Sequence, residues 1–225
     1  MFDAKPDGRH ILLAGATGLV GTQILKLLLA DGGVSQVHVL SRRALDITHP
    51  KLRVSVVDFR NLPALDPVDE VYLALATTEK DAGSREAFRA VDFDANLAVA
   101  KAGFDAGARR AAAITAIGAN ARSSSFYLRV KGELEDALGR LGLEALVIAR
   151  PSLLLGNRDA LQQRPRPFER IAEPVMAVLG LILPRRYRSI RDRDVAGALV
   201  AALPAARGTQ VLFPDDMMRI VNTGR

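Results

Sequence analysis

The sequence contains no cysteine and no tryptophan, and its aromatic side chains are limited to three tyrosines and eight phenylalanines. Without cysteine, the protein cannot use disulfides, thiolate metal sites or a cysteine nucleophile. The net charge of +6 favours anionic partners in general. The basic residues are spread along the chain, without the interleaved aromatic residues that bind single strands. We therefore do not expect nucleic acid as a partner.

Histidine and long apolar runs are also scarce. The three histidines, His10, His38 and His49, do not have the spacing of a metal site, so we expect no bound metal. Residues 1–10 lack the apolar stretch of a signal peptide. The most apolar segment, Pro174–Pro184, is shorter than the roughly 20 residues that span a bilayer. We expect a cytoplasmic protein without a transmembrane segment.

The most informative stretch connects an expected strand, Ile11–Leu13, to an expected helix, Thr22–Ala30. Gly15 permits the tight turn, Gly18 lets the backbone approach a pyrophosphate, and Gly21 allows the helix to pack on the strand. The helix N-terminus would hold the pyrophosphate with its free N–H groups and its dipole. The alternative is a glycine-rich turn with a purely structural role. The stretch predicts a dinucleotide-phosphate site made by Gly15, Ala16, Thr17, Gly18, Leu19, Val20 and Gly21.

Short apolar runs alternate with helical patterns before residue 150, which indicates an α/β protein with a doubly wound parallel sheet. Further strands are expected at Gln36–Leu40, Leu52–Val57, Val71–Leu75, Arg110–Thr115 and Leu143–Ala149. Long helices with apolar residues at helical spacing are expected at Ser84–Ala106 and Ser124–Leu141.

We expect a single NAD(P)-binding domain over residues 1–225, with a dinucleotide-binding core at 1–155 and a C-terminal substrate or lid region at 156–225. Because this region is too small for a core of its own, we expect it to fold over the carboxyl edge of the sheet. Its expected elements are a helix, a short strand, a helix capped by an aspartate, a last strand and a terminal helix, at Phe168–Leu183, Tyr187–Ile190, Asp192–Leu203, Gln210–Phe213 and from Asp215.

The end of the second expected strand indicates which dinucleotide is bound. An NAD site places an acidic residue there, about 20 residues past the glycine turn, to bind the ribose 2′-hydroxyl. This chain has Ser41, Arg42 and Arg43 instead, and its next acidic residue is Asp46. A hydroxyl and two guanidinium groups suit a 2′-phosphate, so we expect NADP(H) rather than NAD(H).

A second pair of residues carries the expected chemistry. Tyr127 and Lys131 are four residues apart, so they share one face of the expected helix. A nearby ammonium favours an ionised phenolate, and it can also bind a ribose hydroxyl. Tyr127 could then exchange the proton of a hydroxyl/carbonyl pair while hydride moves to or from nicotinamide. The alternative is an ordinary amphipathic helix.

Taken together, the GxxGxxG turn, the Ser-Arg-Arg stretch and the Tyr127/Lys131 pair resemble an atypical short-chain dehydrogenase/reductase. The sequence is similar to the Tat-interacting-protein type of NADP-binding oxidoreductase and its bacterial relatives, through about the first 155 residues. The resemblance implies that Asp58 and Phe59 flank the adenine. It further implies that the middle of the cofactor is lined by Ala76, Thr77 and Thr78, and that the nicotinamide is flanked by Pro151, Ser152 and Leu153.

One position departs from the family pattern, in which the second of two hydroxyl residues after the fifth strand polarises the substrate carbonyl. Here that position is Ala116, directly after Thr115. Thr115 could serve after a small shift, Ser124 or Ser125 could reach the site, or the donor is missing. A lost donor of this kind typically lowers the rate by about 100- to 1,000-fold.

We therefore predict an NADP(H)-dependent oxidoreductase that transfers hydride between nicotinamide and a small carbonyl or hydroxyl compound. Tyr127 would act as acid and base, Lys131 would tune it and bind ribose, and Thr115 would be the third catalytic residue. Two alternatives stay open: an NADPH-binding regulatory protein with little turnover, and a dehydratase or epimerase with a tightly bound nucleotide.

The basic run Arg185–Arg193 is interpreted as a solvated surface. The alternative is contact with an anionic substrate, a membrane face or a partner. The apolar segment before it, Val175–Leu183, is expected to belong to the core or to a homodimer contact.

Overall fold

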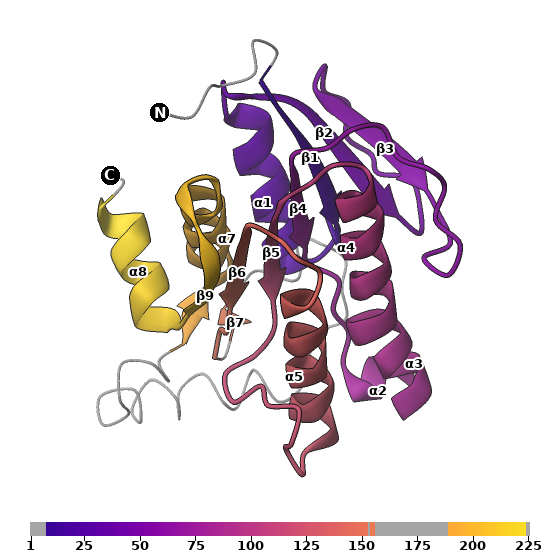
Figure 1. The fold of residues 1–225 in the computed structure, drawn as a ribbon, viewed down its shortest axis with the longest axis vertical. Coiled ribbons are helices and arrows are strands. Elements are labelled where there is room, and N and C mark those ends of the chain that lie inside the picture. Colours follow the sequence, from indigo (N-terminus) through magenta and orange to yellow (C-terminus); the bar gives the residue numbers. More distant parts are fainter. Residues whose placement is uncertain (1–7, 153, 156–188, 224–225) are drawn as a thin grey trace.

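A seven-stranded sheet with helices on both faces forms the centre of the computed structural model, which describes residues 8–152, 154–155 and 189–223 (Figure 1). All neighbouring strands pair in parallel, in the order β3-β2-β1-β4-β5-β6-β9. The order reverses between β1 and β4, and ligands of doubly wound sheets bind at such a switch point. The predicted fold class is confirmed.

The strands of the sheet are β1 (Arg9–Ala14), β2 (Val34–Ser41), β3 (Leu52–Val56), β4 (Glu70–Leu73), β5 (Arg110–Ile114), β6 (Ala145–Ala149) and β9 (Gly208–Leu212). A second, two-stranded parallel sheet pairs β7 (Leu154–Leu155) with β8 (Ile190–Arg191). The helices are α1 (Leu19–Ala30), α2 (Glu79–Ala82), α3 (Arg85–Arg89), α4 (Asn96–Asp105), α5 (Phe126–Gly139), α7 (Asp192–Ala202) and α8 (Pro214–Thr223).

Two apolar layers hold the helices against the sheet, because parallel strands are buried on both faces. On one face, α1 and α7 pack against strand residues such as Ile11 and Val37, and α8 packs on α7. On the other face, α4 and α5 cover residues such as Leu12 and Leu146. Among the described helices, none has the length and apolar character needed to cross a membrane.

The structure corrects the expected helix boundaries in two places. The long helix over 84–106 is divided, because a π-helical turn at Ala90–Ala95 lies between α3 and α4. The expected aspartate cap is wrong: Arg191 is the N-cap residue of α7, and Asp192 lies in the first helical turn. A carboxylate in that turn still stabilises the helix by opposing the positive end of its dipole.

Residues 189–223 are the described part of the C-terminal region. Their strand β9 pairs with β6 as the seventh strand of the sheet, and α7 packs against α1. The expected helix Phe168–Leu183 lies outside the described residues. So do residues 185–188, which begin the basic run Arg185–Arg193 and include Tyr187 and Arg188 of the expected strand.

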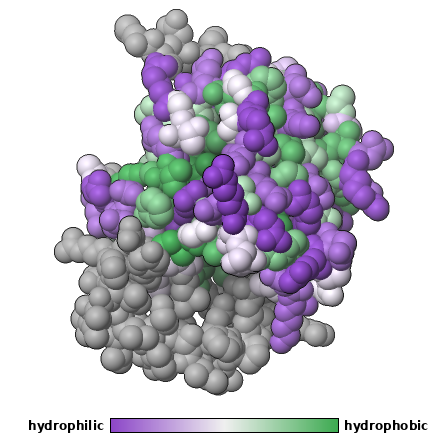
Figure 2. All heavy atoms as spheres, turned by 60° about the horizontal axis from the view of Figure 1, so that its bottom comes forward, coloured by the Kyte–Doolittle hydropathy of each residue, from purple (hydrophilic) through white to green (hydrophobic). Residues whose placement is uncertain are grey.

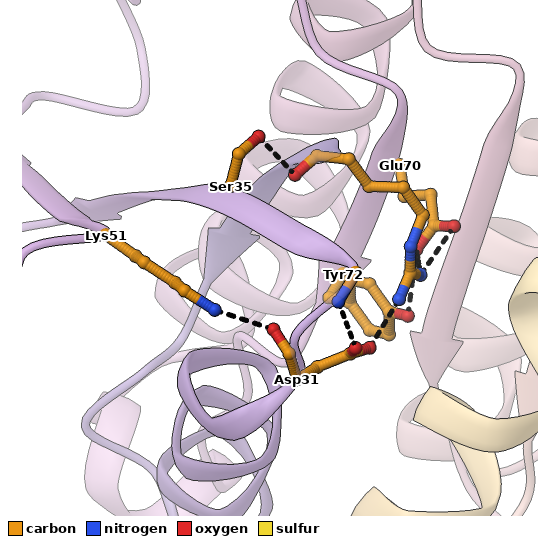
Figure 3. Close-up of polar contacts among 7 residues, drawn as sticks. Asp31, Ser35, Lys51, Glu70 and Tyr72 are labelled. Atoms are coloured by element: carbon orange, nitrogen blue, oxygen red, sulfur yellow. Dashed lines mark hydrogen bonds and ion pairs between the residues drawn. The ribbon is translucent and has the colours of Figure 1, made fainter. Parts of the chain in front are cut away.

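A network of charges closes the amino end of the sheet, opposite the carboxyl ends of the strands. The Arg9 guanidinium donates to both carboxylate oxygens of Glu70 at 2.9 Å and to Asp31 at 2.5 Å. Figure 3 shows Asp31, Glu70 and Tyr72 close together at this end of the sheet. Burial, together with the Glu70 charge, raises the pKa of Tyr72 well above its usual range. Its hydroxyl therefore stays protonated and donates to Glu70 at 3.1 Å. Lys51 donates to the carbonyl oxygen of Asp31.

His38 gives the protein a pH-dependent stability. Its Nε2 lies 2.8 Å from the Ser55 hydroxyl, and burial, with a smaller contribution from Arg53, lowers the pKa of His38. The unfolded chain therefore binds a proton more readily than the native one. The His38 contribution to the free energy of unfolding is fully present above about pH 6.5 and is lost as the pH falls through the native pKa.

We accordingly expect His38→Gln to reduce the loss of stability between about pH 7 and pH 5, the range in which an unperturbed histidine titrates. Denaturant unfolding of the wild type and the variant across this range measures the effect. The substitution His49→Gln serves as a control in the loop before β3. Equal pH slopes for wild type and His38→Gln would contradict the assignment.

Candidate functional site

The carboxyl ends of β1 and β4 meet at the switch point, and two adjoining cavities lie there. The first has a volume of about 480 Å³ and the second about 520 Å³. Gly18, Ala74 and Ala76 line both, so the two cavities adjoin at these residues. Two adjoining cavities suit a ligand with two connected halves.

The glycine turn after β1 is built by close backbone approaches. Gly15 has a φ of +92°, and a Cβ there would lie 2.3 Å from the carbonyl carbon and oxygen of Ala74. A Cβ on Gly21 would lie 2.0 Å from the carbonyl oxygen of Gly15. The packing of β1 against the start of α1 and the segment after β4 thus requires glycine at both positions.

Gly18, the N-cap residue of α1, is different. A Cβ there would meet the nearest protein atom, the Gly15 carbonyl oxygen, at 3.4 Å, which is an ordinary van der Waals contact. The protein's own packing therefore does not require glycine at this position. Gly18 borders both cavities, and its bare backbone at a helix N-terminus suits a phosphate group.

The first cavity contains the residues expected around the adenosine half. Asp58 and Phe59 line it, together with Ser41, Arg42 and Arg43 at the end of β2. The sequence analysis did not single out Arg60, which also lines this cavity. Its guanidinium donates to Asp58 at 2.8 Å, and this contact lowers the pKa of the Asp58 carboxyl. An arginine two residues after an aspartate in a loop belongs to no recognisable motif, so its place in the site could not be predicted.

The second cavity contains the expected catalytic groups. Tyr127, Lys131 and Thr115 line it together with Thr77 and Thr78. The Tyr127 ring packs against Phe88 of α3 with 5.6 Å between ring centroids, and the Lys131 ammonium lies 6.0 Å from the Tyr127 ring centroid. Five further residues that were not predicted as site residues also line it, namely Ala74, Glu79, Lys80, Ile114 and Leu154.

Lys131 forms an ion pair with Asp92, which the sequence analysis did not include in the site. The two groups lie 2.6 Å apart (Nζ to Oδ1), with exposed side-chain fractions of 2% and 0%. Burial raises the pKa of Asp92, whereas the Lys131 ammonium and the backbone N–H of Thr77 oppose this rise. Lys131 is thus a buried cation with a buried counter-ion.

The hydroxyl of Thr115 also has a hydrogen-bond partner within the protein. Its hydroxyl donates to Oε1 of Glu135 at 2.5 Å, and Arg150 holds the same carboxylate through its Nε at 3.0 Å. An O–H group that donates to Glu135 is not available to donate to a substrate carbonyl. Ser124 and Ser125 are exposed and line neither cavity. In this geometry, none of Thr115, Ser124 and Ser125 places a free hydroxyl in the second cavity to polarise a substrate carbonyl.

Four predicted cofactor residues line neither cavity. The side chain of Ala16 is buried, and Gly21 acts in the packing described above. Pro151 is buried and Ser152 is partly buried beyond the end of β6. Leu153 lies outside the described residues. The other predicted cofactor residues line the two cavities: Gly15, Thr17, Gly18, Leu19, Val20, Ser41, Arg42, Arg43, Asp58, Phe59, Ala76, Thr77, Thr78, Tyr127 and Lys131.

Figure 2 brings forward the end of the molecule that lies at the bottom of Figure 1, where α2, α3 and the start of α5 are found. Hydrophilic side chains cover most of the described surface on this side, and apolar atoms show in smaller areas between them. Within the described residues, no group of three or more His, Asp or Glu side chains is placed to hold a metal ion.

A glycine turn at the switch point of a doubly wound parallel sheet defines a Rossmann-like dinucleotide-binding protein. The sequence profile of the NAD(P)H-binding family matches residues 15–205, and the chain belongs to this family. The chain is 33% identical over 216 residues to the protein named "fmp52, mitochondrial" of Emericella nidulans. The aligned stretch covers 88% of this chain and 89% of the relative.

Solved structures show the same fold. MoeE5 in complex with UDP-glucose and NAD has a TM-score of 0.68 and 18% identity, covering 90% of this chain and 75% of its own. The human epimerase family protein SDR39U1 with NADPH has a TM-score of 0.61 and 20% identity. The match covers 91% of this chain and 74% of the SDR39U1 chain. At these identities the likeness concerns the fold alone.

The names of the relatives correct one expectation. Proteins from Emericella nidulans, Candida albicans, Aspergillus clavatus and Coccidioides immitis that match this chain are all named as mitochondrial. The cytoplasmic location expected from residues 1–10 is therefore wrong by this comparison. The composition of residues 1–10 does not distinguish between compartments inside the cell.

Proposed function

We propose that the protein is an NADP(H)-dependent oxidoreductase of the atypical short-chain dehydrogenase/reductase type, acting on a small carbonyl or hydroxyl compound. In this proposal the chain is a single NAD(P)-binding domain, with residues 156–225 contributing to the substrate side. The observation that supports this proposal most is the lining of the second cavity. Tyr127 and Lys131 line the same cavity as Gly18, which lies at the N-terminus of α1.

The residues present fit a dinucleotide. Gly18 leaves room for a pyrophosphate, Arg42 and Arg43 border the first cavity, and Lys131 borders the second. Bound NADPH would supply the hydride. Tyr127 would give its phenolic proton to the substrate carbonyl oxygen, so that the carbonyl becomes a hydroxyl, and would take the proton back in the reverse direction.

The preference for NADP(H) gives a direct test. Replacing both Arg42 and Arg43 with alanine removes two guanidinium groups beside the expected 2′-phosphate. We expect NADPH affinity to fall at least about 100-fold, because two charge-assisted hydrogen bonds, each contributing about 1.5–3 kcal/mol, would be lost. NADH lacks this phosphate, so its affinity should change little. Titrations followed by nucleotide fluorescence measure both constants.

The matched control is Arg140→Ala/Arg219→Ala, which removes the same charge at positions that line neither cavity. We expect it to bind NADPH like the wild type. Equal losses of NADPH and NADH affinity in the Arg42/Arg43 variant would contradict the 2′-phosphate assignment. If the wild type binds neither nucleotide, the whole proposal is overturned.

A second candidate function is an NADPH-binding regulatory protein with little turnover. The observation in its favour is the hydrogen bond from Thr115 to Glu135, together with Ala116 in the place of a second hydroxyl. A site that lacks a carbonyl-polarising donor turns over about 100- to 1,000-fold more slowly. Tight NADPH binding, with no reduction of any carbonyl compound tested, would favour this function.

A further inference from the structure

Asp92 lies behind the wall of the second cavity. Its side chain is fully buried and lines neither cavity, whereas its ion-pair partner Lys131 lines the second. Its other carboxylate oxygen, Oδ2, accepts the backbone N–H of Thr77 at 2.8 Å. Thr77 lines the same cavity from the loop after β4. One carboxylate therefore connects two walls of the cavity, α5 and the β4 loop.

The π-helical turn fixes the position of this carboxylate. Asn96 follows the turn, and its Nδ2 donates to the carbonyl oxygens of Val91 and Asp92, each at 3.2 Å. The same Nδ2 donates at 3.0 Å to the carbonyl oxygen of Leu75, which lies in the β4 loop. The Asn96 amide thus donates to carbonyl oxygens of the π-helical turn and also connects this turn to the β4 loop. π-Helical turns are often found at functional sites.

The charges of the pair complement each other. An ammonium taken out of water is costly unless a carboxylate compensates it. An ammonium group has three N–H donors, and Asp92 occupies one side of it. The remaining donors suit acceptors in the cavity that Lys131 lines, such as the hydroxyl oxygens of a ribose.

We propose that Asp92 is a positioning residue, which holds the Lys131 ammonium and the Thr77 backbone at a fixed separation and thereby sets the affinity for the nicotinamide ribose. This inference rests on the proposed function. Asp92 itself does not touch the cofactor and acts through Lys131. A purely structural ion pair would stabilise the fold without this effect on the cofactor.

Three variants distinguish these roles. Asp92→Asn keeps an acceptor for the Thr77 N–H and removes the counter-charge of Lys131. Lys131→Met keeps most of the aliphatic stem and removes the ammonium. The double variant contains no buried charge at this position. Each is examined for thermal stability and for NADPH affinity, with Asp94→Asn as the matched control, because Asp94 lies exposed in the same π-helical turn.

We expect Asp92→Asn to lower NADPH affinity roughly tenfold and to lower the melting temperature. The double variant should regain most of the stability, because no uncompensated charge remains buried. Its NADPH affinity should equal that of Lys131→Met alone, since Asp92 acts through the lysine. Asp94→Asn should match the wild type in both measurements.

Two results would overturn the inference. One is an Asp92→Asn variant that binds NADPH like the wild type. The other is a double variant whose loss of affinity equals the product of the two single losses, since independent contributions multiply in this way. A wild type that does not bind NADPH overturns the proposed function and this inference with it, whereas the two results above overturn the inference alone.

Discussion

Tyr127→Phe is expected to lower turnover about 100- to 10,000-fold while leaving NADPH affinity within about twofold of the wild type. The change removes one hydroxyl and keeps the ring that packs against Phe88. A large effect is expected because two other hydroxyls that line the second cavity already donate to carboxylates. Thr115 donates to Glu135, and Thr78 donates to Asp81 at 2.7 Å. In the proposed function, the phenol of Tyr127 supplies the proton.

Initial rates of NADPH oxidation measure this effect, using any carbonyl compound that the wild type reduces. Ser124→Ala is the matched control, because it removes a hydroxyl from an exposed residue that lines neither cavity. It should leave the rate unchanged. A Tyr127→Phe variant that reduces the same compound at nearly the wild-type rate would exclude the phenol as the proton donor.

Arg9→Ala should destabilise the fold by about 3–5 kcal/mol, because it leaves the Glu70 carboxylate buried without its counter-charge. The exposed side-chain fractions are 27% for Arg9 and only 2% for Glu70. Water can reach the arginine side of the pair but scarcely reaches the carboxylate. The same guanidinium also holds Asp31 at the end of α1, so its loss loosens the contact between α1 and the start of β1.

Arg53→Ala provides the comparison for this effect. Arg53 pairs with Asp66, with exposed side-chain fractions of 52% and 66%, and exposed pairs contribute at most about 1 kcal/mol. Arg9→Met/Glu70→Met, which removes both charges, should recover much of the stability lost in Arg9→Ala. Denaturant unfolding measures all three variants. An Arg9→Ala variant that is as stable as Arg53→Ala would contradict the assigned role of the network.

The sheet and the glycine turn could be predicted because their signals are local. Runs such as Ile11–Leu13 are apolar at every position, as fully buried parallel strands require. The close backbone contacts of Gly15 and Gly21 admit no side chain, so the sequence must place glycine there. The place of β9 beside β6 could not be predicted, because strand pairing between distant segments depends on how the whole chain packs.

The ion-pair and hydrogen-bond partners of the site residues could not be predicted from the sequence, for a different reason. Asp92 lies in a segment with ordinary helical spacing, where an aspartate is typical of a solvated face, and the sequence contains no signal for a π-helical turn. Glu135 follows Lys131 by one helical turn and would be expected on the surface, yet it is buried against Thr115. Tertiary contacts between α5, the β4 loop and β5 decide both cases.

Transfer of deuterium from the cofactor distinguishes the reduction of a substrate from the use of a recycled cofactor. The protein would be incubated with NADPH that carries deuterium on the transferred position of the nicotinamide, together with a panel of aldehydes and ketones. Mass spectrometry would follow both the cofactor and the products. The account predicts an alcohol that carries the deuterium and an equal amount of released NADP⁺. A turnover that consumes no NADPH would contradict the proposed hydride transfer and would indicate a recycled cofactor. An alcohol formed without the deuterium would also contradict the proposed hydride transfer.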